Sequence, residues 1–173
     1  MSGSYRVYPH NDLVNLGFYH LKTIRAKVEN NVQDAIALDC HSCLIALAFS
    51  VEAFVNFVGD KKVTGWEERQ GFYKKMKQIC EVASIEFDEA VEPFSTLSRI
   101  KILRDSMAHG KPIVGEAKSG TLAREALKCP WDDHLTPEFT EQAYAQVKEF
   151  QKLILDKSGI RLGESITMSS GWE

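Results

Sequence analysis

The chain has 173 residues, of which 44% are hydrophobic and 26% charged, and its formal net charge is −3. This length fits one domain with a substantial core, and the composition is that of an ordinary globular protein. The slightly negative charge excludes a general nucleic-acid coat, because affinity for phosphates comes from lysine and arginine, but it allows a local basic cleft.

Helical periodicity dominates the chain, and no sustained period-2 alternation predicts a sheet. The first helix is expected from about Asp12 to Glu29, with Asn11 or Asp12 as its cap. Its side expected to face the core carries Leu13, Leu16, Tyr19 or His20, Ile24 and Val28.

The second helix is expected from about Val32 to Val58, where Gly59 is suited to a left-handed stop. Between Leu44 and Val58 every residue is apolar except Ser50, Glu52 and Asn56. A helix that is apolar on all sides is predicted at the centre of a bundle. No window reaches the roughly 20 apolar residues of a membrane span, so we expect no membrane association of that kind.

A third helix is expected over residues 66–83 and a fourth over 93–108 or 109, with Pro93 in its first turn. In the third, Phe72, Met76, Ile79 and Cys80 are expected inward, and Lys74, Lys75 and Lys77 largely outward.

A long connection over residues 111–135, with a short helix near 122–127, is expected before the last helix. Thr136 and Pro137 begin that helix, and it ends before Gly159. The tail over 159–173 is expected to be flexible. The prediction is a single all-α domain: an up-and-down bundle of four to five helices with its core at about 12–158.

The four cysteines are interpreted as small core residues rather than as a redox or metal site. Cys40 and Cys43 bracket CHSC, which invites a zinc interpretation, but no second Cys/His pair at metal spacing accompanies them. We therefore expect no metal and no cofactor. The polar start MSGSYRVYPHND lacks the apolar core of a signal peptide, so a cytoplasmic location is expected.

Arg104 lies near the middle of the apolar stripe of the fourth helix, where an unpaired guanidinium would cost several kcal/mol. Glu52 is the only ionisable residue in the apolar part of the second helix, and Asn56 follows one turn later. Because both charges are costly alone, we predict that Glu52 and Arg104 pair, with Asn56 adding a hydrogen bond.

His109 follows Arg104 by five residues, which an ideal helix separates by about 140°. Asp105 stands four residues before His109 and is expected to orient its ring. Two interpretations stay open from these residues alone. In the first, Arg104 and Glu52 only fix the packing of their helices, and His109 only caps a helix. In the second, His109 is an acid/base group, and Arg104 binds an anion beside it.

The segment KILRDSMAHGKP resembles the R-x4-6-H motif of the HEPN superfamily, an arginine and a polar residue followed by a histidine at a helix end. Arg104, Asp105 and His109 match these positions, and Glu52 and Asn56 match the acidic or amide residues of the family's central helix. The resemblance covers the helical core.

The resemblance implies a metal-independent endoribonuclease that acts as a homodimer, often a toxin or phage-defence component restrained by an antitoxin or regulatory protein. His109 would be the acid/base group, Arg104 would stabilise the scissile phosphate, Asp105 would orient His109, and Glu52 would hold Arg104. Pairing about a two-fold axis would bring Arg104 of one copy to His109 of the other.

Lys101 and Lys111 are the candidates for binding RNA. The alternative function that the family allows is a non-catalytic adaptor or a module that binds nucleotides or RNA.

Overall fold

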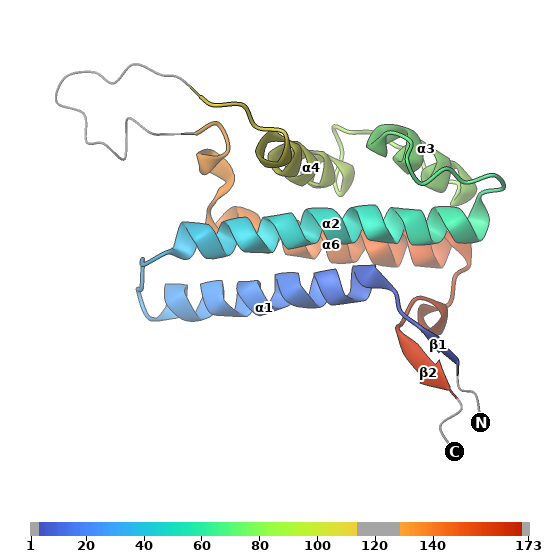
Figure 1. The fold of residues 1–173 in the computed structure, drawn as a ribbon, viewed down its shortest axis with the longest axis horizontal. Coiled ribbons are helices and arrows are strands. Elements are labelled where there is room, and N and C mark those ends of the chain that lie inside the picture. The colour runs from blue at the N-terminus through green and yellow to red at the C-terminus, as the bar shows by residue number, and fades with distance from the viewer. Residues whose placement is uncertain (1–3, 114–128, 171–173) are drawn as a thin grey trace.

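The computed structural model describes residues 4–113 and 129–170, and within them the chain forms the predicted all-α bundle. Three long helices lie side by side: α1 (Pro9–Glu29), α2 (Ile36–Lys62) and α6 (Pro137–Ser158). The shorter helices α3 (Phe72–Val82) and α4 (Phe94–Ala108) lie on the side of α2 opposite α1 (Figure 1).

Helix α2 is the centre of the bundle, as its composition predicts, and it contacts each of the other four α-helices in the described ranges. By length and composition it is also apolar enough to cross a membrane, and no other helix in the described ranges meets that criterion. Inside the protein, however, 61% of its most apolar stretch is buried. That burial is typical of the core helix of a bundle.

The core-facing side of α1 differs from the prediction. Leu16 and Val28 were expected inward but are exposed; of the alternatives Tyr19 and His20, Tyr19 is exposed and His20 half-buried. Gly17 explains the error, because it is buried in the middle of the true stripe and adds no apolar side chain to the pattern. A Cβ at Gly17 would lie 3.0 Å from Cδ2 of Leu47, so its absence allows α1 and α2 to approach closely. The buried positions of α1 are His10, Val14, Gly17, Leu21 and Ile24.

The predicted bounds of the first two helices also need correction. Helix α1 begins at Pro9, and neither Asn11 nor Asp12 caps it. Helix α2 begins at Ile36 and continues through Gly59 to Lys62. Gly59 is buried under Trp66, and a Cβ there would lie 2.3 Å from atoms of the indole ring. The glycine therefore serves close packing rather than a left-handed stop.

Helix α3 begins at Phe72 instead of residue 66, whereas α4 and α6 follow the prediction closely. Thr136 caps α6 by accepting a hydrogen bond of 3.2 Å from the backbone N–H of Phe139. Gly159 ends α6 in the left-handed conformation, with φ of 66°. The predicted short helix near residues 122–127 lies outside the described residues.

The tail takes a folded path that the sequence did not predict. Strand β2 (Met168–Ser170) pairs antiparallel with β1 (Ser4–Arg6). A 3₁₀ turn over Leu162–Glu164 precedes it, and Lys61 Nζ holds Glu164 Oε1 at 2.6 Å. Three-residue strands at opposite ends of the chain are too short for period-2 alternation to reveal them.

Cys40, Cys43 and Cys80 are buried and free, in line with their interpretation as core residues. Burial raises the pKa of the Cys43 and Cys80 thiols to about 12, so both remain protonated and unreactive near neutral pH. In the part of the chain that the structure describes, no three His, Cys, Asp or Glu residues gather in a group suited to a metal ion.

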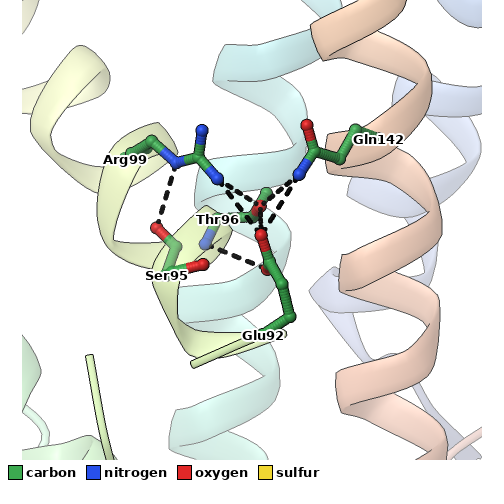
Figure 2. A network of polar contacts seen from close by, with 5 residues as sticks. All are labelled: Glu92, Ser95, Thr96, Arg99 and Gln142. Atoms are coloured by element: carbon green, nitrogen blue, oxygen red, sulfur yellow. Dashed lines mark hydrogen bonds and ion pairs between the residues drawn. The ribbon is translucent and has the colours of Figure 1, made fainter. Parts of the chain in front are cut away.

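A polar network connects the start of α4 to α6 (Figure 2). Glu92 Oε1 accepts hydrogen bonds from Thr96 Oγ1 at 2.8 Å, Arg99 Nη2 at 3.1 Å and Gln142 Nε2 at 3.1 Å. Burial opposes ionisation of Glu92, but the hydrogen bonds from Thr96 and Ser95 outweigh it and lower the pKa of the carboxyl. The network fixes the N-terminal half of the helix that carries the candidate motif.

Replacing Gly59 with alanine is expected to lower the free energy of unfolding by about 1–3 kcal/mol, because the new methyl group overlaps the Trp66 ring. Urea unfolding measures this change. Gly163→Ala is the control, since a Cβ at Gly163 meets nothing within 4 Å. A Gly59→Ala protein as stable as the natural one would contradict close packing as the role of this glycine.

Candidate functional site

The carboxylate of Glu52 lies between two cations from different helices. Its Oε2 is 2.5 Å from Nη2 of Arg104 on α4, and its Oε1 is 3.2 Å from Nζ of Lys75 on α3. The predicted contact between Glu52 and Arg104 is therefore confirmed. One side chain at the centre of α2 thus joins three helices by charge.

Lys75 is buried, with 1% of its surface exposed, so the expectation that it points outward is wrong. Besides Glu52, its ammonium donates to Asn56 Oδ1 and to the backbone oxygen of Glu68, both at 3.0 Å. All three donors of the ammonium are thereby satisfied, which offsets the cost of burial. Asn56, predicted to support Arg104, supports Lys75 instead.

Arg104 is held against α2, with 17% of its side chain exposed. Its Nη1 lies 3.0 Å from Oδ1 of Asp105, and its guanidinium carbon lies 5.4 Å from the centroid of the Phe49 ring. Its Nε is buried and has no hydrogen-bond partner in the described part of the chain. A guanidinium whose position is fixed by its neighbours can stabilise phosphate charge without reorganising.

Asp105 contacts cations rather than the histidine that it was expected to orient. One of its oxygens is 2.7 Å from Nζ of Lys101, and the other contacts Arg104. Hydrogen bonds from these two cations are charge-assisted and therefore stronger than a hydrogen bond from a neutral imidazole N–H, so the carboxylate contacts the cations. Lys101 also lies over the ring of Tyr73, at 5.1 Å. Its charge is therefore already engaged.

His109 is the residue that follows α4, and its ring is exposed. Its backbone N–H still donates to the oxygen of Asp105 at 2.9 Å, which fixes its place on the last turn. Among the residues described, none hydrogen-bonds to its ring. The next position, 110, requires a glycine, because a Cβ there would lie 2.6 Å from the backbone oxygen of Ser106. Lys111 is exposed beyond it.

Within one chain the two main residues of the motif stay apart. Arg104 faces Glu52 and Phe49 of α2, and no described contact joins its side chain to that of His109. This agrees with their separation of about 140° around the helix. The described contacts within one copy therefore do not bring the two groups together.

Sequence reasoning missed Lys75, Phe49 and Tyr73. The signal for Lys75 was present, because it stands three residues after Phe72 and four before Ile79, within the buried stripe of α3. Phe49 stands three residues before Glu52 and shares its face of α2, but a phenylalanine in an apolar run is normally interpreted as a core residue. Nothing in the sequence singles out Tyr73.

No family model matches this chain, and neither the curated proteins nor the solved structures contain a significant match to it. The resemblance to the HEPN superfamily therefore depends on the sequence motif and on Glu52 and Asn56 of the central helix.

Replacing Glu52 with alanine is expected to lower the free energy of unfolding by about 2–4 kcal/mol, because it leaves the buried Lys75 and the largely buried Arg104 without their shared counter-charge. Chemical denaturation measures the loss. The matched control is Glu141→Ala, which removes the exposed ion pair with Arg25 and is expected to cost about 1 kcal/mol or less. Equal losses for the two variants would contradict a special role of Glu52.

Proposed function

We propose that this protein is a metal-independent endoribonuclease of the HEPN type that acts as a homodimer. The observation that carries the proposal is that one helix holds both an exposed imidazole, His109, and, five residues earlier, a guanidinium that the partly buried carboxylate of Glu52 fixes in place. An acid/base group and a fixed cation are the two elements that phosphodiester cleavage without a metal requires.

The proposed reaction begins with attack of a ribose 2′-oxygen on the adjacent phosphorus. His109 accepts the proton of the 2′-hydroxyl and passes it to the 5′-oxygen as the bond from phosphorus to that leaving oxygen breaks. Arg104 stabilises the charge that develops on the phosphate oxygens. Glu52 keeps Arg104 in position. The products are a 2′,3′-cyclic phosphate and a 5′-hydroxyl, so atoms and protons balance without a metal.

Exposed apolar side chains favour a second copy on the face of α4 that carries His109. Ile102 stands seven residues before His109, close to two turns, so both lie on one side of the helix. It is 58% exposed, and Phe49 and Leu38 of α2 are exposed as well. A partner packed about a two-fold axis against this face would bury Ile102. It would bring Arg104 of one copy toward His109 of the other if it also covered the exposed Phe49 of α2, which Arg104 contacts.

The proposed cellular role is that of a toxin or defence component in the cytoplasm, with an antitoxin or regulatory protein as its partner.

One observation favours a non-catalytic function as the second candidate. Glu52 and Asp105 both contact Arg104, and Asp105 also engages Lys101, so two cations of the motif are already compensated by carboxylates. In that case the motif would build the dimer or bind a phosphate without cleavage, as an adaptor or as a module that binds nucleotides or RNA.

Purified protein is expected to cleave RNA in the presence of EDTA and to leave cyclic phosphate ends. His109→Ala and Arg104→Ala are each expected to slow cleavage at least about 100-fold, because they remove the proton-transfer group and the charge-stabilising group. His20→Ala serves as the control histidine, since it lies on α1, away from the motif. Gel analysis of end-labelled RNA measures the rates.

Absence of cleavage of any RNA by a folded, dimeric protein would contradict the nuclease and favour the adaptor. Undiminished cleavage by His109→Ala would contradict the assigned role of that residue.

Ile102→Asp is expected to convert the dimer into a folded monomer, because it places a charge in the proposed apolar interface. Sedimentation measures the mass, and circular dichroism measures the fold. Val91→Asp is the control, since Val91 is equally exposed but precedes α4. A natural protein that stays monomeric at all concentrations, or an Ile102→Asp protein that still dimerises, would contradict this interface.

A further inference from the structure

A cavity of about 380 Å³ lies at the end of the bundle where α1 begins and α2 ends (Figure 1). One side of it is a stripe of α2 whose members recur at helical spacing: Ala53, Asn56, Phe57 and Asp60. The other sides come from the start of α1, with Tyr8, and from the loop before α3, with Trp66 and Glu68. The volume is in the range of pockets that hold small molecules.

Three aromatic rings line this cavity, and their neighbours fix their positions. The ring of Tyr8 contacts that of Phe57 edge to face, with centroids 5.0 Å apart. The indole of Trp66 lies against Gly59, where a Cβ would be 2.3 to 2.4 Å from three of its ring atoms. Tyr8, Phe57 and Trp66 are each half-buried, so part of each side chain is open to a ligand. The faces of aromatic rings are negative and attract cations.

The charged groups that line the cavity are acidic. Asp60 and Glu68 are exposed, and neither carboxylate forms a hydrogen bond or an ion pair with any described residue. Among the lining residues only His10 can become a cation, and burial lowers the pKa of its ring, which favours the neutral form. The described lining therefore carries two negative charges and no positive charge at neutral pH.

One buried cation lies behind the lining. The ammonium of Lys75 donates to Asn56 Oδ1 and to the backbone oxygen of Glu68, both at 3.0 Å, and so fixes two lining residues. Lys75 is 1% exposed, so it does not reach a ligand in the cavity. Its charge is opposed by that of Glu52, whose Oε1 is 3.2 Å away. The excess of negative charge at the cavity therefore comes from the two free carboxylates.

We propose that this cavity binds a small organic cation with a quaternary ammonium group, such as choline. The methyl groups pack against the rings of Tyr8, Phe57 and Trp66, and the charge is attracted by the ring faces and the two carboxylates. A primary ammonium would need acceptors for three N–H groups, which aromatic walls do not supply, whereas a quaternary ammonium has no N–H. No lining residue forms a hydrogen bond or ion pair with Arg104 or His109 in the described structure, so the site does not depend on the proposed nuclease function.

Calorimetric titration of the full chain with choline tests the proposal. Dimethylbutanol, the neutral carbon analogue of choline, has the same shape without the charge, and choline is expected to bind saturably and about tenfold or more tightly. Ethanolamine, with its primary ammonium, is expected to bind more weakly than choline. Phosphocholine distinguishes a free cation from a lipid headgroup. It is expected to bind more weakly as well, because its phosphate lies close to the carboxylates.

The surface variant Asp60→Asn/Glu68→Gln tests the charge without touching the core. It is expected to weaken choline binding about tenfold or more, because it removes both attracting charges. The matched control is Glu67→Gln/Glu81→Gln, which removes two charges from exposed residues outside the lining and is expected to bind choline as the natural protein does.

Two replacements of Tyr8 test the aromatic wall. Tyr8→Phe keeps the ring and is expected to bind choline within about twofold of the natural protein, whereas Tyr8→Leu is expected to bind about tenfold more weakly. Circular dichroism checks that both variants fold. Absence of saturable choline binding by the natural protein would overturn the proposal. So would dimethylbutanol, ethanolamine or phosphocholine binding as tightly as choline, or choline binding that survives the loss of both carboxylates.

Discussion

The carboxylate of Glu52 is the constraint on which the site depends. It is the one anion at the centre of an apolar helix, and it contacts Lys75 of α3 and Arg104 of α4. Each of these cations is costly to bury without it. The same contact that joins three helices also decides where the guanidinium lies. Stability and the geometry of the candidate site are therefore consequences of one interaction.

That geometry has a further consequence for function. Arg104 is drawn toward α2, where it also lies over Phe49, whereas His109 stands exposed at the end of α4. No described contact brings the two groups together within one copy. The proposed two-fold dimer would supply each group from a different copy and leave the ion pairs of Arg104 intact. The exposed Ile102 lies on the face where such a copy would pack.

The sequence was sufficient for those features that follow from one residue in a strong local context. A lone glutamate and a lone arginine in two apolar stripes must meet, and Thr136 and Gly159 bound the last helix by their own chemistry. It was insufficient where the cause lies in another part of the chain. Gly59 lies inside α2 and packs against the ring of Trp66, which leaves no room for a side chain. Lys75 is buried because three oxygens, from α2 and from the loop before α3, accept hydrogen bonds from its ammonium. Asp105 contacts Lys101 and Arg104 instead of His109, and the relative positions of these side chains are known only from the folded structure.

Mixed dimers give the most direct test of a site shared between two copies. Arg104→Ala and His109→Ala proteins, each inactive alone, are combined so that subunits exchange. A shared site predicts that a heterodimer regains one of its two sites, so a random mixture recovers about a quarter of the natural ribonuclease activity. A mixture that exchanges subunits fully and stays as inactive as its parents would contradict the account.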